Sequence, residues 1–266
     1  MAKLGFFIQS SNQELFKNNT EVLKEYYRQT IKDNSFDIEL FSFTSDENAT
    51  NVYEVGDTIY CNCNDGDVFS KHYLLFKYIQ ENKKYDWMLF TNNTTLVNIF
   101  FLYYNIAEFN HNIYYCLNNV NNKIFGEYPN GNFKLMGFDM FLKILGVFET
   151  AKICLTPLHD FIYGANKTTY KWYGVPEDLI IGRCLNKIQA SYMTVASYNY
   201  ASLFDYLGSR IVDINQCADE WYHLSAITFR TPWYICGNEV DNYNYRLENE
   251  TNLLKQLINK IQENNE

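Results

Sequence analysis

The chain has 266 residues, of which 47% are hydrophobic and 20% charged, and its formal net charge is -9. A chain of this length and composition can bury a substantial core, which excludes an intrinsically disordered protein. The acidic balance argues against a protein that binds a nucleic-acid backbone. No stretch is long and apolar enough for a membrane span or a secretory signal. We therefore expect a globular, cytoplasmic protein with no nucleic-acid partner and no membrane span.

The first part of the chain predicts alternating strands and helices. Apolar residues that run together or alternate predict three strands, at Lys3–Ile8, Phe36–Phe43 and Val55–Tyr60. Helical spacing predicts helices at Glu14–Lys32 and Val68–Gln80. Asp67 stands immediately before the second helix, where a carboxylate caps the first turn.

The stretch Tyr85–Asn98 reads YDWMLFTNNTTLVN and combines three patterns. The apolar run Trp87–Phe90 is typical of a strand buried on both faces of a sheet. A polar turn follows at Thr91–Thr95, and a helix is predicted at Leu96–Ile106. Open α/β sheets bind ligands where a strand ends and the next helix begins, so this stretch predicts a ligand site.

The rest of the chain predicts further elements of both kinds. We expect a strand at Ile113–Leu117 and a hairpin that pairs Val120–Phe125 with Asn132–Met136, because Pro129 and Asn130-Gly131 are typical turn residues. The remaining predicted strands are Arg210–Ile214 and Trp221–Arg230. The remaining predicted helices are Phe138–Phe148, one that has Pro176 as its first residue, Ala201–Leu207 and Leu247–Ile261.

The seven cysteines do not form a recognisable metal-binding pattern. Cys61-x-Cys63 is the only close pair, and it lacks the second pair that a structural zinc site needs. We expect reduced cysteines.

Two motifs resemble the Fringe-like and β-1,3-galactosyl/N-acetylglucosaminyltransferase family. YDWMLFTNNTTLV resembles the family segment "yDwilktDDDtfv", whose acidic triplet is the metal-binding DxD motif of a GT-A sugar-nucleotide fold. Asn92, Asn93 and Thr94 stand in the three acidic positions. The stretch VPEDLIIGRCL resembles the family's "pEDVyvGxcl" and lies downstream in the same order. The resemblance implies that Asp178 is the general base, with Glu177 as the second candidate.

Three weaker matches follow the same family order. Arg28 lies in a match to "IRxTW", although an arginine on a helix is usually a solvated side chain. Lys71 stands where the family has the lysine of "D..DSY.NLtlKT", and the alternative is that this acidic stretch is only a solvated turn. Ile227–Arg230 resembles the closing segment "isfH", with Arg230 in the place of the histidine that completes the metal site.

The departures from the family concern the residues that would hold a divalent cation. Hard cations prefer carboxylates to neutral amides, so we expect no metal and no other cofactor, although a divalent metal stays possible. Six residues are predicted to bind the donor: Asn92, Asn93, Thr94, Arg28, Lys71 and Arg230. Arg230 and a helix N-terminus after Thr94 would neutralise the leaving diphosphate.

Taken together, these observations predict an α/β protein with a GT-A-type, Rossmann-like mixed sheet flanked by helices. We expect a single domain over 1–266, with a nucleotide-binding half at 1–117 and an acceptor-side half at 118–266. The predicted function is an inverting, metal-independent glycosyltransferase that moves a sugar from a UDP- or GDP-linked donor to a glycan hydroxyl.

Two alternatives remain open at this point. One is a catalytically inactive relative that binds glycan or nucleotide. The other is a different α/β nucleotide-using enzyme, such as a nucleotidyltransferase, for which Phe6–Asn12 lacks the expected Gly-rich phosphate loop. The residues do not specify the donor sugar, the base, the acceptor or the oligomeric state.

Overall fold

The computed structural model describes residues 2–163, 175–198, 214–228 and 239–264. The described helices are α1 (Glu14–Asn34), α2 (Val68–Asn82), α3 (Ile99–Asn105), α4 (Phe138–Tyr163), α5 (Glu177–Lys187), α6 (Ile214–Glu220) and α7 (Glu239–Glu263). The described strands are β1 (Leu4–Gln9), β2 (Ile38–Ser45), β3 (Tyr53–Val55), β4 (Thr58–Cys61), β5 (Trp87–Asn92), β6 (Thr95–Val97), β7 (Ile113–Cys116), β8 (Asn119–Asn122), β9 (Gly126–Pro129), β10 (Phe133–Gly137), β11 (Ser191–Thr194), β12 (Ser197–Tyr198) and β13 (Ala226–Thr228).

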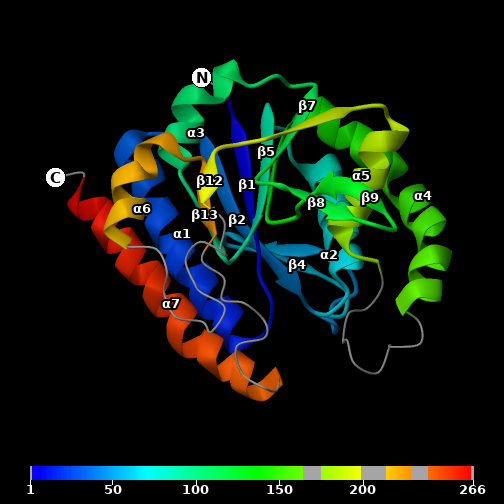
Figure 1. Ribbon diagram of the computed structural model, residues 1–266, viewed down its shortest axis with the longest axis horizontal. Coiled ribbons are helices and arrows are strands. Elements are labelled where there is room, and N and C mark those ends of the chain that lie inside the picture. Colours follow the sequence, from blue (N-terminus) through cyan, green and yellow to red (C-terminus); the bar gives the residue numbers. More distant parts are fainter. Residues whose placement is uncertain (1, 164–174, 199–213, 229–238, 265–266) are drawn as a thin grey trace.

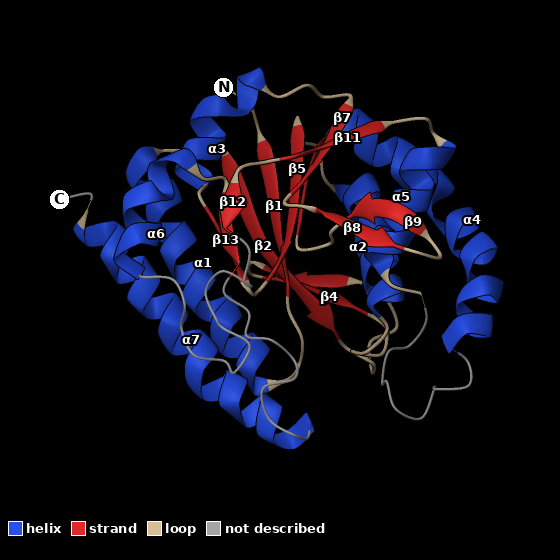
Figure 2. Ribbon diagram, viewed as in Figure 1, coloured by secondary structure: helices blue, strands red, loops and turns tan. Residues whose placement is uncertain are grey.

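The centre of the molecule is a mixed sheet of eight described strands in the order β11-β7-β10-β5-β1-β2-β4-β3. Helices α1, α6 and α7 lie on one side of this sheet, and α2, α4 and α5 lie on the other (Figure 1). Figure 2 shows the same three layers, with the strands between two groups of helices. The predicted α/β class, a mixed sheet flanked by helices, is therefore confirmed.

The two central strands have apolar side chains on both faces, as their continuous apolar sequences predict. In β1, Phe6 packs in the core beneath α1 and α7, whereas Phe7 packs in the core beneath α2 and α4. Phe7 stacks between Phe41 of β2 and Phe90 of β5, with ring centroids 5.5 and 5.2 Å apart. These two apolar layers hold β1 between β2 and β5, with which it pairs in parallel.

The predicted helix after the central turn begins later than expected. Thr95–Val97 form the short strand β6, which pairs antiparallel with β13, and the Val97 N–H donates to the Tyr27 hydroxyl at 2.7 Å. The Asn98 side chain then caps α3 by accepting from the Phe101 N–H. The sequence prediction of a helix from Leu96 was wrong because pairing with a distant strand decides this segment.

The predicted hairpin was also wrong. β8 pairs with β9, because the side-chain oxygen Oδ1 of Asn122 accepts from the Ile124 and Phe125 N–H groups and closes the turn there. β10 instead enters the main sheet, where it runs antiparallel to both β5 and β7. The predicted turn at 127–131 is therefore the link that carries the chain from the hairpin into the sheet.

Several other boundaries differ from the expectations. The third predicted strand is two strands, β3 and β4, joined at Gly56, whose φ is +60°. Helix α4 extends to Tyr163, and Pro176 is the N-cap of α5 rather than its first residue. A short 3₁₀ helix, Trp221–His223, precedes β13 where a continuous strand was predicted. The predicted helix Ala201–Leu207 and most of the predicted strand Arg210–Ile214 lie outside the described residues.

Two further findings concern the described residues only. None of the described helices is long and apolar enough to cross a membrane. The cysteines that the structure describes in full, namely Cys61, Cys63, Cys116, Cys154 and Cys184, are free thiols, as predicted.

Candidate active site at the carboxyl edge of the sheet

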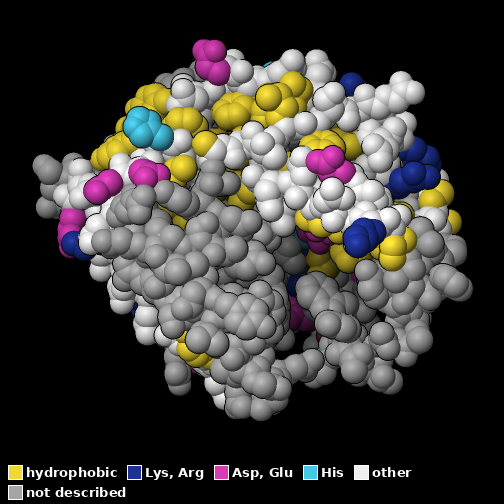
Figure 3. All heavy atoms as spheres, in the orientation of Figure 1, with side chains coloured by type: hydrophobic (Ala, Val, Ile, Leu, Met, Phe, Trp, Pro, Cys, Tyr) yellow, Lys and Arg dark blue, Asp and Glu magenta, His cyan; other side chains and the backbone are white. Residues whose placement is uncertain are grey.

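The topology defines one edge of the sheet as the expected ligand site. The parallel strands β1, β2, β4 and β5 all end at this edge, at Gln9, Ser45, Cys61 and Asn92. The chain passes from β1 through α1 to β2 on one side of β1, whereas β5 lies on its other side. Doubly wound sheets bind ligands at such a switch point. Figure 3 shows acidic and basic side chains inside a recess near the centre of the drawn face.

The polar turn at the end of β5 is closed by its own side chains. The Asn92 amide group donates to Asn132 Oδ1 at 2.6 Å, and Asn92 Oδ1 accepts from the Thr94 N–H, the Thr94 hydroxyl and the Thr95 hydroxyl at 3.2, 3.0 and 2.8 Å. Asn93 is buried and donates to the Phe16 carbonyl of α1 at 2.9 Å. The three predicted donor-binding residues of this turn therefore have partners within the protein.

Asp178 and Glu177 are brought to the same edge by the start of α5. Both are partly buried, and they pack against Gly131 in the link before β10. A Cβ atom at Gly131 would lie 2.6 Å from Glu177 Oε1 and 3.1 Å from Asp178 Cβ, so a side chain at this position would force Glu177 or the turn to shift. The next residue, Asn132, binds Asn92. The two sequence motifs thus meet through one short turn.

The two carboxyl groups have different electrostatic surroundings. Burial alone would raise the pKa of Glu177, but the Lys134 ammonium, 3.0 Å from Glu177 Oε1, and the nearby His72 hold that pKa below its usual value. Burial raises the pKa of Asp178 to about 7, and the charge of Glu177 adds to this rise. Among the described residues, the hydrogen bond to the Asp178 carboxyl comes from the Leu179 N–H. Glu177 is therefore a paired carboxylate, and Asp178 can take up or release a proton near neutral pH.

Lys71 is buried and braces the loop that follows β1. Its ammonium donates to the Ser10 carbonyl at 3.2 Å and lies 2.8 Å from Asp65 Oδ1. Asp65 in turn accepts from the Ser11 hydroxyl and the Asn12 N–H at 2.6 and 3.0 Å. Asp67, as predicted, caps α2 by accepting from the Ser70 N–H. Lys71 therefore lies at the predicted edge, but its charge is directed into the protein.

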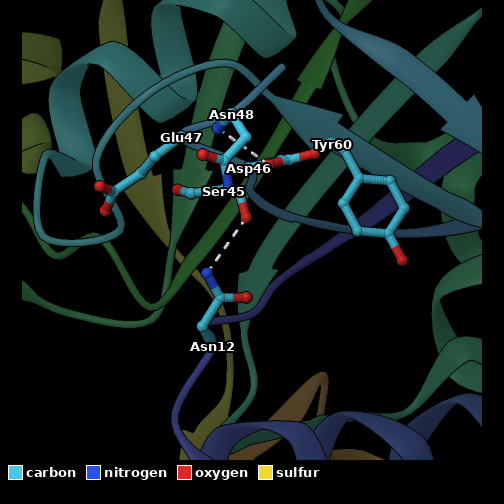
Figure 4. A pocket seen from close by; sticks show the side chains of 6 residues that line it. All are labelled: Asn12, Ser45, Asp46, Glu47, Asn48 and Tyr60. Atoms are coloured by element: carbon cyan, nitrogen blue, oxygen red, sulfur yellow. Dashed lines mark hydrogen bonds between the residues drawn. The ribbon is translucent and has the colours of Figure 1, made fainter.

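A hollow of about 370 Å³ opens beside this loop. It is lined by Asn12, Ser45, Asp46, Glu47, Asn48 and Tyr60 (Figure 4). The Asn12 side chain donates to the Ser45 carbonyl at 3.1 Å, which joins the loops after β1 and β2. The sequence analysis missed this hollow. The signal was present in the polar residues that directly follow two predicted strands.

Arg28 does not reach the carboxyl edge. Its Nε donates to Asp57 Oδ2 at 2.9 Å, and Asp57 stands directly before β4, at the amino end of that strand. The prediction that Arg28 binds the donor is therefore not supported by its position. Arg230 lies outside the described residues, so its predicted role stays a prediction.

A divalent cation at this edge would need oxygen ligands, preferably carboxylates. Within the described ranges, no group of three or more His, Cys, Asp or Glu is arranged to hold a metal ion. The only side-chain oxygen of Asn92 already accepts three hydrogen bonds. The turn after β5 therefore does not fit a cation that prefers carboxylates.

No protein-family model and no curated protein matches this sequence. A glycosyltransferase involved in the glycosylation of the major capsid of PBCV-1 resembles the structure with 11% identity and a TM-score of 0.46, over 92% of this chain and 98% of that chain. The galactosyltransferase LgtC, solved with donor and acceptor sugar analogs, has 11% identity and a TM-score of 0.47, over 95% of each chain.

The glycosyltransferase GlyE of Streptococcus pneumoniae TIGR4 has 11% identity and a TM-score of 0.42, over 98% of this chain and 64% of that chain. At this identity and TM-score, the three likenesses do not assign the chain to a family. Its function is therefore inferred from the residues of the site.

Proposed function

We propose that this protein is a glycosyltransferase that moves a sugar from a nucleotide sugar to a hydroxyl group of a glycan, with inversion and with Asp178 as the general base. One observation carries the proposal: Asp178, whose pKa is raised to about 7, lies at the switch-point edge beside the turn that ends β5. A group with a pKa near the working pH is the most effective proton acceptor. The resemblance of the Pro176–Leu185 stretch to a transferase motif supports the same assignment.

The carboxyl groups favour a single displacement. Asp178 accepts the proton of the acceptor hydroxyl, the oxygen of that hydroxyl bonds to the anomeric carbon, and the bond from that carbon to the diphosphate oxygen breaks. The bonding electrons leave with the nucleoside diphosphate. A double displacement would need a second free carboxylate as nucleophile, but Glu177 is paired with the buried Lys134. One attack from the acceptor side inverts the anomeric carbon.

The hollow beside the loop after β1 is the proposed site of the nucleoside. Its volume of about 370 Å³ lies within the usual size of small-molecule sites. Asn12 and Asn48 offer amide groups to a base or ribose, and Tyr60 offers a ring face. Metal independence, and the neutralisation of the leaving diphosphate by Arg230, remain part of the proposal. The predicted helix N-terminus cannot assist as expected, because β6 separates Thr94 from α3.

One observation favours the alternative of a non-catalytic binding protein. Asn92, Asn93 and Thr94 use their polar groups inside the protein, as a turn that only maintains the fold would. The intact Glu177-Asp178 pair at the same edge argues against it, because a partly buried carboxyl that loses its proton near pH 7 is costly to keep without a use.

Calorimetric titration with UDP, GDP and a panel of nucleotide sugars, each with Mn²⁺ and with EDTA, tests the proposal. We expect binding that survives EDTA, followed by transfer of the sugar to an oligosaccharide panel. Binding without any transfer would favour the non-catalytic alternative. Binding that requires Mn²⁺ would overturn metal independence and direct attention to Asp65 and Asp67. No binding in either condition would overturn the proposed function.

A further inference from the structure

A buried lysine lies between the two parts of the candidate site. Lys134 has 1% of its side chain exposed and pairs with Phe90 in the register of β10 on β5. Its ammonium lies 3.0 Å from Glu177 Oε1 and donates to the Gly131 carbonyl at 2.5 Å. A charge this deeply buried is costly unless it is paired and hydrogen bonded, so its presence in an otherwise apolar strand needs a reason.

The partners of Lys134 belong to two different segments of the edge. Gly131 belongs to the turn whose next residue, Asn132, binds Asn92 at the end of β5. Glu177 is the first residue of α5 and precedes Asp178. One ammonium group therefore joins the turn beside β5 to the helix that carries the proposed base.

Further titratable groups around the carboxyl pair come from two other elements. His72 and Lys71 lie on α2, and Tyr114 lies on β7. Burial, with Lys134 as a further cause, lowers the pKa of His72 to about 4, so this side chain is neutral at pH 7. Lys71 is engaged with Asp65. Among the described residues, Lys134 is therefore the cation that forms an ion pair with the Glu177 carboxylate of α5.

We propose that Lys134 is a positioning residue for sugar transfer: its ammonium holds the Gly131 turn against Glu177 and thereby fixes the Asp178 carboxyl at the edge of the sheet. The inference rests on the proposed function, because the position of Asp178 matters only if that carboxyl accepts a proton. Lys134 acts through Glu177 and Gly131, and its buried ammonium is not offered to a substrate.

The main test compares Lys134→Met with Lys24→Met, assayed with the donor that the wild type uses. Lys24 is a matched control: its side chain is 3% exposed, and its ammonium lies 2.6 Å from Asp57 Oδ1, in an ion pair outside the candidate site. Both variants lose a buried lysine and its ion pair, so we expect both to unfold at lower temperatures, although Asp57 keeps Arg28 as a partner. Only Lys134→Met should lose kcat, by about 100-fold, as expected for a displaced catalytic group. The KM for the donor should change little in both, because the nucleoside hollow is left intact.

A second variant separates positioning from a folding defect. Lys134→Met/Glu177→Gln removes both charges, so that no unpaired carboxylate stays buried if the single variant fails to fold. We expect the double variant to fold and still to lose kcat, because the Gly131 turn is no longer held. Glu177→Gln alone should move the acidic limb of the kcat/KM profile to lower pH, because it removes a charge that raises the pKa of Asp178. An unchanged limb would mean that Asp178 is not the group that titrates in the profile.

The outcomes distinguish the two proposals. If the wild type transfers sugar and Lys134→Met keeps its kcat, the positioning role is overturned and the proposed function stands. The positioning role is also overturned if Lys134→Met and Lys24→Met lose kcat equally. If the wild type transfers no sugar from any donor, the proposed function is overturned and the positioning role falls with it. A loss of kcat confined to the Lys134 variants, with the pH shift in Glu177→Gln, supports both.

Discussion

Two polar segments meet at the carboxyl edge of the sheet, and they use their side chains in opposite ways. In the turn after β5, Asn92, Asn93 and Thr94 are neutral and form hydrogen bonds to the turn itself, to Asn132 or to α1. At the start of α5, Glu177 is an ion-paired carboxylate, and Asp178 has a pKa raised to about 7.

This difference separates a structural role from a chemical one. A polar group whose hydrogen bonds are all made inside the protein stabilises a geometry, and it has little left to offer a ligand. A carboxyl group that is partly buried and changes charge near neutral pH is costly to the fold and useful to a reaction. In the proposed function, the segment that resembles a metal motif is the support, and the helix start is the reactive part.

The largest effect is expected from Asp178→Asn, which keeps the shape and removes the proton acceptor. We expect kcat to fall by roughly 10²–10⁴-fold, the usual contribution of a general base. The control is Asp139→Asn, because Asp139 also lies in the first turn of a helix but is exposed and follows the opposite end of β10. If Asp178→Asn keeps the kcat of the wild type, Asp178 is not the general base and the start of α5 has no catalytic role.

The same substitution should raise stability above neutral pH. The pKa of Asp178 in the folded protein is raised above the ordinary carboxyl value of 3.8. The stability linked to such a group is complete below the ordinary pKa and is lost as the pH rises through about 7. Asparagine stays neutral, so Asp178→Asn should unfold at a higher temperature than the wild type at pH 8, as measured by circular dichroism.

The next largest effect is expected where the two segments touch. In Gly131→Ala the new methyl group would lie 2.6 Å from Glu177 Oε1 and 3.1 Å from Asp178 Cβ, so the Glu177 carboxylate, the turn or the helix start must shift. A displacement of this size can reduce kcat by about 100-fold. The control is Gly146→Ala in α4, where a Cβ atom meets open space and alanine should stabilise the helix by about 1 kcal/mol without changing kcat. Equal activity in the two variants would show that the contact does not matter for transfer.

The structural role of the turn predicts a different kind of loss in Asn93→Ala. This change removes the donor to the Phe16 carbonyl at 2.9 Å, although that carbonyl still accepts from the Thr20 hydroxyl at 2.6 Å. Chemical denaturation should show a loss of about 0.5–1.5 kcal/mol in the free energy of unfolding, the net contribution of one hydrogen bond. The kcat per folded molecule should stay close to that of the wild type. Weaker donor binding with unchanged stability would instead restore Asn93 as a donor-binding residue.

The strands and helices near the centre could be predicted because their signals are local. The apolar runs of β1 and β5 and the helical spacing of α1 and α2 are legible in short windows. The start of α5 was also predicted closely, because Pro176 and two acidic residues are typical of a helix N-terminus. These elements were enough to locate the edge at which Asp178 lies.

What the sequence could not provide depends on partners far along the chain. β6 is a strand because β13 pairs with it, and β10 belongs to the main sheet because it pairs with β5 and β7. Likewise, nothing in the sequence of the segment Phe133–Gly137 predicts that Lys134 will form an ion pair with Glu177, on a helix in the second half of the chain. Local patterns predict elements, whereas tertiary pairing decides which side chains meet.

The smallest effect is expected for Arg28→Ala, which tests whether a predicted donor-binding residue has only a surface role. The Arg28 side chain is 43% exposed, and its partner Asp57 keeps a second cation, because the Lys24 ammonium lies 2.6 Å from Asp57 Oδ1. An exposed pair of this kind contributes less than about 1 kcal/mol, so the unfolding midpoint should change little. Donor affinity and kcat should equal those of the wild type, since Arg28 lies beside the amino end of β4 rather than at the carboxyl edge. A clear loss of donor affinity in calorimetry would mean that α1 contributes to the site after all, and that the contrast between the turn after β5 and the start of α5 does not describe the whole donor-binding surface.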